Sequence, residues 1–241
     1  MSTAPAERRP LVVFEGGEGS GKSTQIGRLA SWLEGRGVPV TVARDPGSTR
    51  VGQAVRSVLL DPASQPMDGR TELLLYAAAR AQLVREALEP ALAAGRVVLL
   101  DRYEDSTWAY QGGGRGVPAH ELAAVNRVAT GGLRPDLVVL LDLPPEEGLR
   151  RAAADRGADR LEGESAAFHG RVRDVYRARA AADPSRWLVL DGRRPADDLE
   201  RDIRRRVTAL LEPSTSSPAS APTPTPFPTP SSDPRPANDL R

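Results

Sequence analysis

Eight residues near the start of the chain have the types and spacing needed to hold a row of phosphates. The run from Gly16 to Ser23 reads G-G-E-G-S-G-K-S and fits the phosphate-loop pattern G-x-x-x-x-G-K-[ST]. Its glycines let backbone N–H groups turn inward around phosphate oxygens, and the following helix offers its unpaired N–H groups. Lys22 would reach the β- and γ-phosphates, and the Ser23 hydroxyl would hold Mg²⁺. We expect these residues to bind ATP: Gly16, Gly17, Glu18, Gly19, Ser20, Gly21, Lys22, Ser23 and Thr24.

The use of basic residues supports this interpretation of Lys22. Lys22 is the sole lysine among 33 lysine and arginine residues. A compact ammonium suits a position between phosphates, so a chain that otherwise uses arginine has lysine where that position requires it. A flexible glycine-rich surface turn is the alternative. It would not explain the apolar run Leu11–Phe14 before the loop and the helical pattern after it.

Length and composition restrict the function further. At 241 residues the chain fits one α/β domain, and its net charge of +1 offers no bulk field for nucleic acid or an acidic membrane surface. There are no cysteines, and the two histidines are too few for a histidine metal centre. No signal peptide or membrane-spanning run is visible. We expect a cytoplasmic protein with small anionic ligands, and with neither nucleic acid nor membrane as a partner.

The elements that position the phosphate loop alternate between strand and helix. Apolar runs predict strands at 11–14, 38–43, 96–100, 137–141 and 187–190. Helical spacing predicts helices at 23–36, 51–60, 71–94 (bent or ended near Pro90), 106–111, 118–129, 145–154, 166–182 and 197–211, with 112–116 (G-G-G-R-G) as a loop. Continuous apolar strands between helices indicate a parallel sheet covered on both faces. The expected fold is a three-layer α/β/α domain at 11–211 with a five-stranded parallel sheet, after an N-terminal extension at 1–10.

Two segments interrupt or end this alternation. Residues 155–164 (D-R-G-A-D-R-L-E-G-E) are charged and lie between helical patterns, so we expect a mobile lid at about 150–164. Residues 212–241 are rich in proline, serine and threonine, with Phe227 and Leu240 as the large apolar groups. Such a segment cannot bury enough apolar surface to order itself, and we expect a disordered tail. Recognition of its P-T-P-T-P-F-P run as a polyproline helix is the alternative.

Further runs, in the right order, resemble one family. The run from Asp101 to Gly116 (D-R-Y-E-D-S-T-W-A-Y-Q-G-G-G-R-G) is similar to the thymidylate kinase signature, and residues 44–49 (R-D-P-G-S-T) resemble the R-E-P-G-G-T of that family. Matches at 73–82, at 135–146 and in the D-R-L-E of the lid extend the resemblance from residue 11 to about residue 211. It implies a P-loop kinase and homodimer that makes dTDP from dTMP with Mg·ATP, for dTTP synthesis in DNA replication.

Transfer between two phosphates gathers negative charge, so arginines are expected at the ends of strands. Arg44 and Arg102 each follow a strand and are placed to bind the acceptor phosphate with their forked donors. Ion pairs of these arginines with Asp45 or Asp101 are the alternative, and both interpretations can hold together.

The resemblance implies the residues that bind the acceptor nucleoside. It assigns Arg80 to a hydrogen bond with thymine and Tyr76 to stacking on it, although periodicity equally allows Tyr76 as helix core. Ser106 and Gln111 fall in the same region. Tyr110 would lie where a ribose 2′-hydroxyl would clash, which selects deoxyribose.

Three carboxylates follow from the same resemblance. Glu18 is similar to the acidic group that family members direct toward the acceptor sugar. Asp101 ends a strand of the kind that carries a Walker-B carboxylate, which gives it a role in orienting arginine or a Mg²⁺-bound water. Asp142 offers the same pattern, and the sequence does not choose between Asp101 and Asp142.

The phosphate loop has no arginine, and in this the chain resembles the bacterial subgroup of the family, which implies that the lid supplies the transition-state arginine. We expect Arg151 and Arg156 to close over the transferring phosphate, with Arg160 supporting them, although a solvated charged loop is the alternative for each. The chain departs from the family pattern at Asp45, Ser48 and Tyr76. Asp45 replaces a longer glutamate, so we expect its partner to be reached through water.

Other functions share parts of this pattern. Another nucleoside monophosphate kinase would keep the arginines, whereas a deoxynucleoside kinase would need a general base for its hydroxyl acceptor. A GTP-binding switch protein would need an N-K-x-D motif, which the chain lacks. A nucleic-acid-binding ATPase is disfavoured by the charge balance and scarce aromatics.

Overall fold

The fold is that of a computed structural model, which describes residues 9–153 and 160–212 of the chain. Contacts group the chain into two units, of which the first ends at Leu211, and that unit is described below. Three expectations lie outside the described residues: the extension at 1–8, the lid positions 154–159 with Arg156, and the tail from residue 213.

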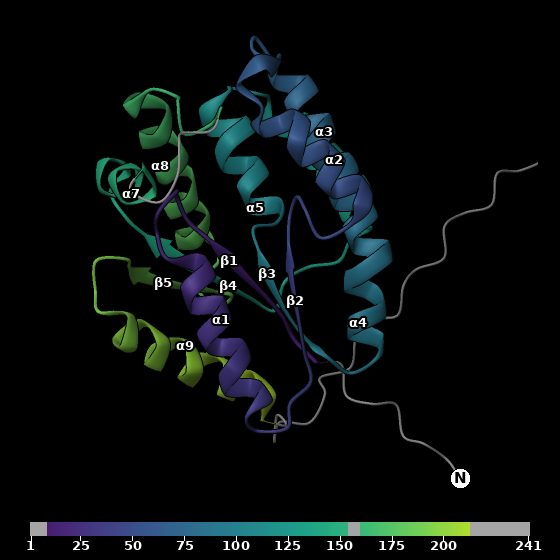
Figure 1. The fold of residues 1–241 in the computed structure, drawn as a ribbon, viewed down its shortest axis with the longest axis vertical. Helices are drawn as coiled ribbons and strands as arrows, with labels where there is room; N and C mark the ends of the chain where they lie inside the picture. Colours follow the sequence, from purple (N-terminus) through teal and green to yellow (C-terminus); the bar gives the residue numbers. More distant parts are fainter. Residues whose placement is uncertain (1–8, 154–159, 213–241) are drawn as a thin grey trace, which may run out of the picture. The chain divides into compact units, whose positions relative to one another are not determined.

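In the described part of the chain, five parallel strands form one sheet in the order β2-β3-β1-β4-β5 (Figure 1). The strands are β1 (Leu11–Glu15), β2 (Val40–Arg44), β3 (Val97–Asp101), β4 (Leu137–Asp142) and β5 (Trp187–Asp191). Every residue of β1 and β3 is buried, as expected of central strands covered on both faces. The predicted five-stranded parallel sheet is confirmed.

Helices connect the strands and fill the layers on either side of them. They are α1 (Lys22–Glu34), α2 (Arg50–Leu60), α3 (Gly69–Leu83), α4 (Glu89–Ala93), α5 (Glu104–Thr107), α6 (Ala119–Thr130), α7 (Pro145–Ala153), α8 (Ala166–Ala182) and α9 (Ala196–Leu211). A 3₁₀ turn, η1 (Pro62–Ser64), follows α2, and π-helical stretches η2 (Val84–Leu88) and η3 (Trp108–Gly114) follow α3 and α5. No helix among the described residues is both long and apolar enough to cross a bilayer.

Two apolar clusters hold the three layers together, one on each face of the sheet. Val12 and Phe14 of β1 belong to the cluster that α1 and α9 cover. Leu11 and Val13 belong to the opposite cluster, covered by η2, α4, η3 and α8. Successive strand residues therefore serve alternate layers, which explains why the strands read as continuous apolar runs.

Two local features differ from the expectations. The helical run expected at 71–94 is present, as α3, η2 and α4 in succession, but it does not end at Pro90, which lies in the first turn of α4, where a missing N–H is tolerated. The glycines at 112–114 belong to η3 rather than to a loop. A Cβ on Gly114 would lie 2.4 Å from the ring of Phe168, so these glycines permit close helix packing rather than a turn.

The carboxyl ends of three neighbouring strands meet at one edge of the sheet. Chain order reverses around β1, since β3 lies on one side of it and β4 on the other. Open α/β sheets bind ligands in the crevice at such a point. The register pairs Arg44 with Asp101, and Asp101 with Phe14 of β1. The fold thus brings Arg44 and Asp101 to the edge where the phosphate loop leaves β1.

Candidate active site

The phosphate loop connects β1 to α1 through backbone conformations that glycine allows. Gly16 has φ of 140° and Gly19 has φ of 63°. A Cβ on Gly16 would lie 2.5 Å from the carbonyl oxygen of Leu141, and one on Gly19 would lie 2.1 Å from that of Gly148. The loop is therefore packed directly against the end of β4 and against α7, and its position depends on both.

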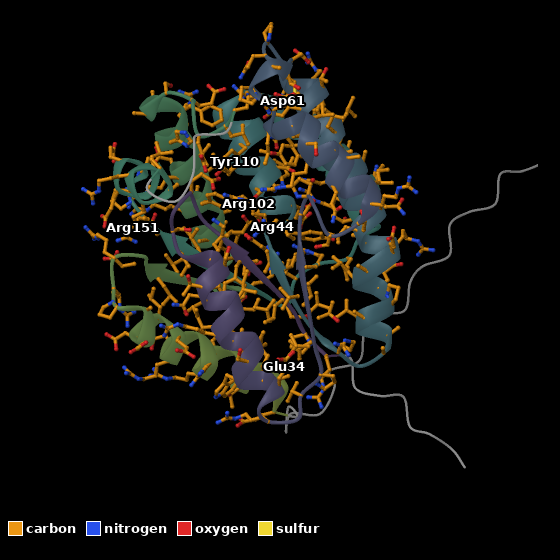
Figure 2. All side chains as sticks on the ribbon, viewed as in Figure 1. Glu34, Arg44, Asp61, Arg102, Tyr110 and Arg151 are labelled. Atoms are coloured by element: carbon orange, nitrogen blue, oxygen red, sulfur yellow. The ribbon has the colours of Figure 1, made fainter. Side chains whose placement is uncertain are left out.

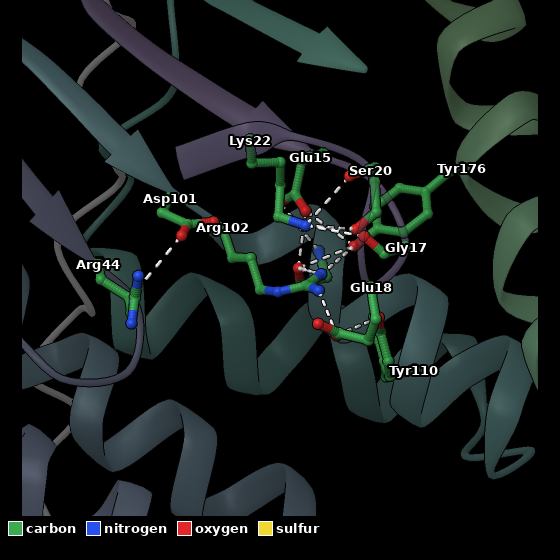
Figure 3. A network of polar contacts seen from close by, with 12 residues as sticks. Glu15, Gly17, Glu18, Ser20, Lys22, Arg44, Asp101, Arg102, Tyr110 and Tyr176 are labelled. Atoms are coloured by element: carbon green, nitrogen blue, oxygen red, sulfur yellow. Dashed lines mark hydrogen bonds and ion pairs between the residues drawn. The ribbon is translucent and has the colours of Figure 1, made fainter. Parts of the chain in front are cut away.

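Lys22 closes the phosphate loop on itself. Its Nζ donates to the carbonyl oxygens of Gly16 (3.0 Å) and Gly17 (2.9 Å) and to the Ser20 hydroxyl (3.3 Å) (Figure 3). Burial lowers the pKa of Lys22 to about 8, and the neighbouring charge of Arg102 acts in the same direction. Phosphate oxygens placed beside it would favour the charged form and stabilise the ammonium.

A cavity of about 670 Å³ opens in front of the loop. Four arginines from different parts of the fold line it: Arg44, Arg56, Arg102 and Arg151. The loop contributes Glu18 to Thr24, and Asp101, Ala152 and Glu162 complete the lining. In Figure 2, Arg44, Arg102 and Arg151 lie along one region of the molecule, at the carboxyl edge of the sheet. Positive charge from distant sequence positions is thus gathered where phosphates would lie.

Arg102 is held in place by an acidic residue of the phosphate loop. Its Nη2 donates to Glu18 Oε1 at 2.5 Å, and the Tyr110 hydroxyl donates to the same oxygen at 3.2 Å (Figure 3). Arg102 also lies over the Tyr110 ring, with its Cζ 5.1 Å from the centroid. Its φ of 68° is in the left-handed region, an uncommon conformation that non-glycine residues adopt mainly at functional sites. Glu18 and Tyr110 therefore fix the position of the Arg102 guanidinium between the loop and η3.

The choice between Asp101 and Asp142 can be tested by their partners. Arg173 binds both oxygens of Asp142, through Nε at 2.6 Å and Nη2 at 3.0 Å. Asp101 lies 3.3 Å from Arg44 through Oδ2, while its Oδ1 is buried and accepts no hydrogen bond from the described residues. The described residues contain no cluster of three metal-ligating side chains, but Mg²⁺ bound to nucleotide needs few protein ligands. Asp101 lines the phosphate cavity together with Ser23, whereas Asp142 does not, so Asp101 is the better placed of the two for a Mg²⁺ bound to nucleotide.

A second, narrower pocket adjoins the phosphate cavity. Its lining includes the residues that the resemblance places around the acceptor nucleoside: Glu18, Tyr76, Arg80, Ser106, Tyr110 and Gln111. Of the two arginines expected at the acceptor phosphate, Arg102 lines this pocket and Arg44 lines the phosphate cavity. Asp45, Thr107 and Leu161 complete the lining of the pocket. Glu18 and Arg102 line both spaces, so the two are joined at these residues.

Arg80 lies at the buried end of this pocket and is almost fully bound. Its Nε donates to Asp45 at 2.5 Å, and its other donors reach the Thr107 hydroxyl, the Asn126 amide oxygen and the Tyr103 carbonyl. A guanidinium has five N–H groups, so four contacts leave one for a ligand. The expectation that Asp45 reaches its partner through water is wrong, because the carboxylate contacts Arg80 directly.

The two lid arginines that are described lie in different environments. Arg151, on α7, is 39% exposed, lines the phosphate cavity and donates to Glu147 and to the Gly192 carbonyl. Arg160 is buried and bound to Glu72 and to the carbonyl of Leu59, so the expected support of the phosphate by Arg160 is wrong. The expectation of a solvated loop is likewise wrong at 160–162, since all three residues are buried.

Sequence reasoning missed Glu15, which is fully buried behind Arg102. Its carboxylate accepts four hydrogen bonds: from the backbone N–H of Tyr103 and Ser106 and from the hydroxyls of Ser106 and Tyr176. Burial raises its pKa to about 7, although Arg102 and the two hydroxyls act in the opposite direction. A charged residue that ends an otherwise apolar strand was the available signal.

Comparisons with known proteins agree on one family. The family profile described as Thymidylate kinase matches residues 14–203. A thymidylate kinase of Desulforudis audaxviator is 51% identical over 203 residues, which are 84% of this chain and 91% of the relative. That of Deinococcus radiodurans is 52% identical, covering 80% of this chain and 93% of the relative, and that of Cutibacterium acnes is 48% identical, covering 83% and 97%.

Proposed function

This chain belongs to the thymidylate kinase family, and we propose from that premise how its residues divide the work of phosphorylating dTMP to dTDP with Mg·ATP. The observation that carries the proposal is the shared wall of the two pockets, made by Glu18 and Arg102. A nucleoside monophosphate in the narrow pocket would present its phosphate at this wall. There it would meet the γ-phosphate of a nucleotide bound along the phosphate loop.

On the acceptor side, Arg102 and Arg44 bind the phosphate of dTMP. Both guanidiniums face carboxylates in the structure, Glu18 and Asp101, and a dianionic phosphate competes for them as a bidentate partner. Release of Glu18 from Arg102 leaves a carboxylate beside the sugar, where it accepts a hydrogen bond from a sugar hydroxyl. Tyr76 stacks on the base. Arg80 donates a hydrogen bond to the base from the one N–H group that is not bound by its buried partners.

On the donor side, the backbone N–H groups of the loop and the start of α1 hold the phosphates of ATP. Lys22 exchanges its loop carbonyls for phosphate oxygens, and Ser23 and Asp101 hold Mg²⁺ directly or through water. Mg²⁺, when bound, neutralises charge that develops on the β- and γ-phosphates. Arg151 donates to the transferring group after leaving Glu147, with Arg156 as the second arginine expected from the sequence.

A homodimer is proposed from an exposed apolar face. α3 packs against both α2 and α6, which places the three helices side by side. Val51 and Val58 on α2, Leu74 on α3 and Val128 on α6 are 46 to 79% exposed, and exposed apolar residues that gather on neighbouring elements mark interaction sites. A second copy of the chain is the occupant that the family resemblance implies. A cytoplasmic location agrees with nucleotide substrates and stays a prediction.

An acceptor panel with Mg·ATP tests the assignment. We expect dTMP to be the preferred acceptor, dUMP to be weaker, and AMP, GMP and CMP to be near background, because the narrow pocket offers a pyrimidine site under Tyr76 and Arg80. A purine preference would overturn the assignment.

Tyr110→Phe keeps the ring and should still reject the ribose analogue of dTMP, whereas Tyr110→Ala should accept that analogue. Equal rejection by both variants would remove the proposed role of Tyr110.

A further inference from the structure

Glu72, on α3, is a fully buried carboxylate that the reaction does not use. Oε1 accepts from Gln111 Nε2 at 2.8 Å and from Arg115 Nε at 3.3 Å. Oε2 accepts from Arg160 Nη2 at 2.6 Å and from Arg115 Nη2 at 3.1 Å. The carboxylate thus binds three side chains from two distant parts of the chain.

One of these contacts fixes the direction of an amide in the acceptor pocket. An ionised carboxylate accepts hydrogen bonds and cannot donate them. The amide nitrogen of Gln111 must therefore face Glu72, and its oxygen must point elsewhere. Gln111 lines the acceptor pocket, so the charge of Glu72 decides which polar group of Gln111 that pocket receives.

Another contact holds a short segment that borders both pockets. Arg160 is bound on three sides, because its Nη2 reaches Glu72, its Nε donates to the Leu59 carbonyl at 2.6 Å, and its backbone N–H donates to the Leu60 carbonyl. The next residue, Leu161, lines the acceptor pocket, and Glu162 lines the phosphate cavity. Displacing Arg160 would therefore move a wall of each space.

We propose that Glu72 and Arg160 form a positioning pair for the acceptor: Glu72 orients Gln111, and its buried ion pair with Arg160 holds residues 160–162, which line the acceptor pocket at Leu161 and the phosphate cavity at Glu162. Neither residue is catalytic, since neither touches reacting atoms. The inference rests on the acceptor site proposed above and names two residues that set its shape. A buried ion pair is weak evidence for stability alone, whereas fixing one arrangement of polar groups is a well-attested use.

Steady-state kinetics of the full chain test the pair, with Glu72→Gln as the first variant. This change keeps the shape but replaces one of the two acceptor oxygens by a donor, so Gln111 and Arg160 can no longer both find an acceptor at residue 72. We expect KM for dTMP to rise about tenfold or more, as displacement of a binding group by about 1 Å can produce. The affinity for ATP, measured by equilibrium binding without acceptor, should change less than about twofold, because Lys22 and the loop are untouched and Glu162 is the one residue of the 160–162 segment that lines the phosphate cavity.

Arg160→Lys keeps the charge and covers the case in which Glu72→Gln does not fold. It should raise KM for dTMP in the same direction, and the double variant should cost no more than the larger single effect if the two residues act through each other. A merely structural role would give additive losses of Tm and equal losses for both substrates.

Glu121→Gln is the matched control. Glu121 of α6 pairs with Arg70 of α3, the helix that also carries Glu72. Arg70 is 63% exposed, and the pair lies outside both pockets. It should leave KM for dTMP unchanged. An active wild type whose KM for dTMP is unmoved by both Glu72→Gln and Arg160→Lys would overturn the positioning pair alone. A wild type that does not phosphorylate dTMP would instead overturn the proposed function.

Discussion

The phosphate cavity and the acceptor pocket are neighbours, yet their charged groups are held in opposite ways. In the cavity, Arg44 is 48% exposed and Arg151 is 39% exposed, and each is paired with a carboxylate at the surface of the site. In the pocket, Arg80 is 1% exposed and bound by buried groups, and displacing them would cost much free energy. The cavity therefore exchanges partners when phosphate arrives, whereas the pocket is arranged before the base arrives.

This difference follows from what each region must recognise. Phosphates carry enough charge to compete for an arginine that a carboxylate holds near water, where an ion pair contributes little. A neutral base has no such charge, so its pocket depends on donors and acceptors already fixed in direction. Substitutions in the cavity should thus change rate with little loss of stability, and substitutions behind the pocket should change both.

The largest expected effect is in the cavity. Lys22→Ala should lower kcat/KM by a factor on the order of 10³, because it removes a donor from the transferring phosphates. The Tm should change by no more than about 3 °C, which corresponds to about 1 kcal/mol, since the ammonium is held mainly by loop carbonyls. Arg28→Ala, on the exposed side of the same helix, should retain activity. A large fall in Tm for Lys22→Ala would break the comparison.

Behind the pocket, Arg80→Lys should cost stability as well as acceptor affinity. A lysine cannot reproduce the planar fork that binds four partners, and Asp45 is left buried beside a poorer one. We expect a loss of about 3 kcal/mol in the free energy of unfolding, as for a disrupted buried ion pair. Thermal or denaturant unfolding measures it, with Arg85→Lys, whose arginine is 79% exposed, as the control. Unchanged stability would show that the arginine in the pocket can change its partners as readily as the arginines in the cavity.

Glu15 gives the comparison a pH dependence. A carboxyl whose pKa is raised on folding, here from 4.5 to about 7, binds its proton more tightly in the folded chain. Its contribution to stability is complete below about pH 4.5 and is lost as the pH rises through about 7, by up to about 3 kcal/mol. Glu15→Gln should flatten this part of the stability profile, measured without ligands. Glu34→Gln, at an exposed position of α1, should keep the wild-type slope, and two parallel profiles would contradict the prediction.

The smallest effect concerns Arg151, the site arginine on α7. Arg151→Lys keeps the charge but loses the fork, so kcat should fall more than about tenfold while the KM values change little. The Tm should be unchanged because the side chain is partly in water. Arg150→Lys, at the preceding exposed position, should behave as wild type. Normal kcat in Arg151→Lys would mean that Arg102 and Lys22 meet the transition-state charge.

The sheet, most of its helices and the phosphate loop could be predicted from the sequence, because they depend on local patterns, whereas the acceptor residues were expected from the family resemblance. Apolar runs predict the buried strands, and the spacing of glycine, lysine and serine predicts the phosphate loop. The pairing of charges could not be predicted, since Asp45 with Arg80, and Glu72 with Arg160, are joined only by tertiary packing. Arg160 is the clearest example, because it belongs to a highly charged run of the sequence and yet is buried, paired with the buried carboxylate of Glu72.

Lys22 also makes the site chemically addressable. Amine-reactive reagents attack the neutral amine, so a lysine with a pKa of about 8 reacts under mildly alkaline conditions in which ordinary lysines, at about 10.4, remain protonated. The chain has no second lysine to compete for the reagent, which leaves the terminal amine as the other target. Intact-mass spectrometry after brief acylation would then count the fraction of phosphate loops that a ligand shields, with no need to follow turnover.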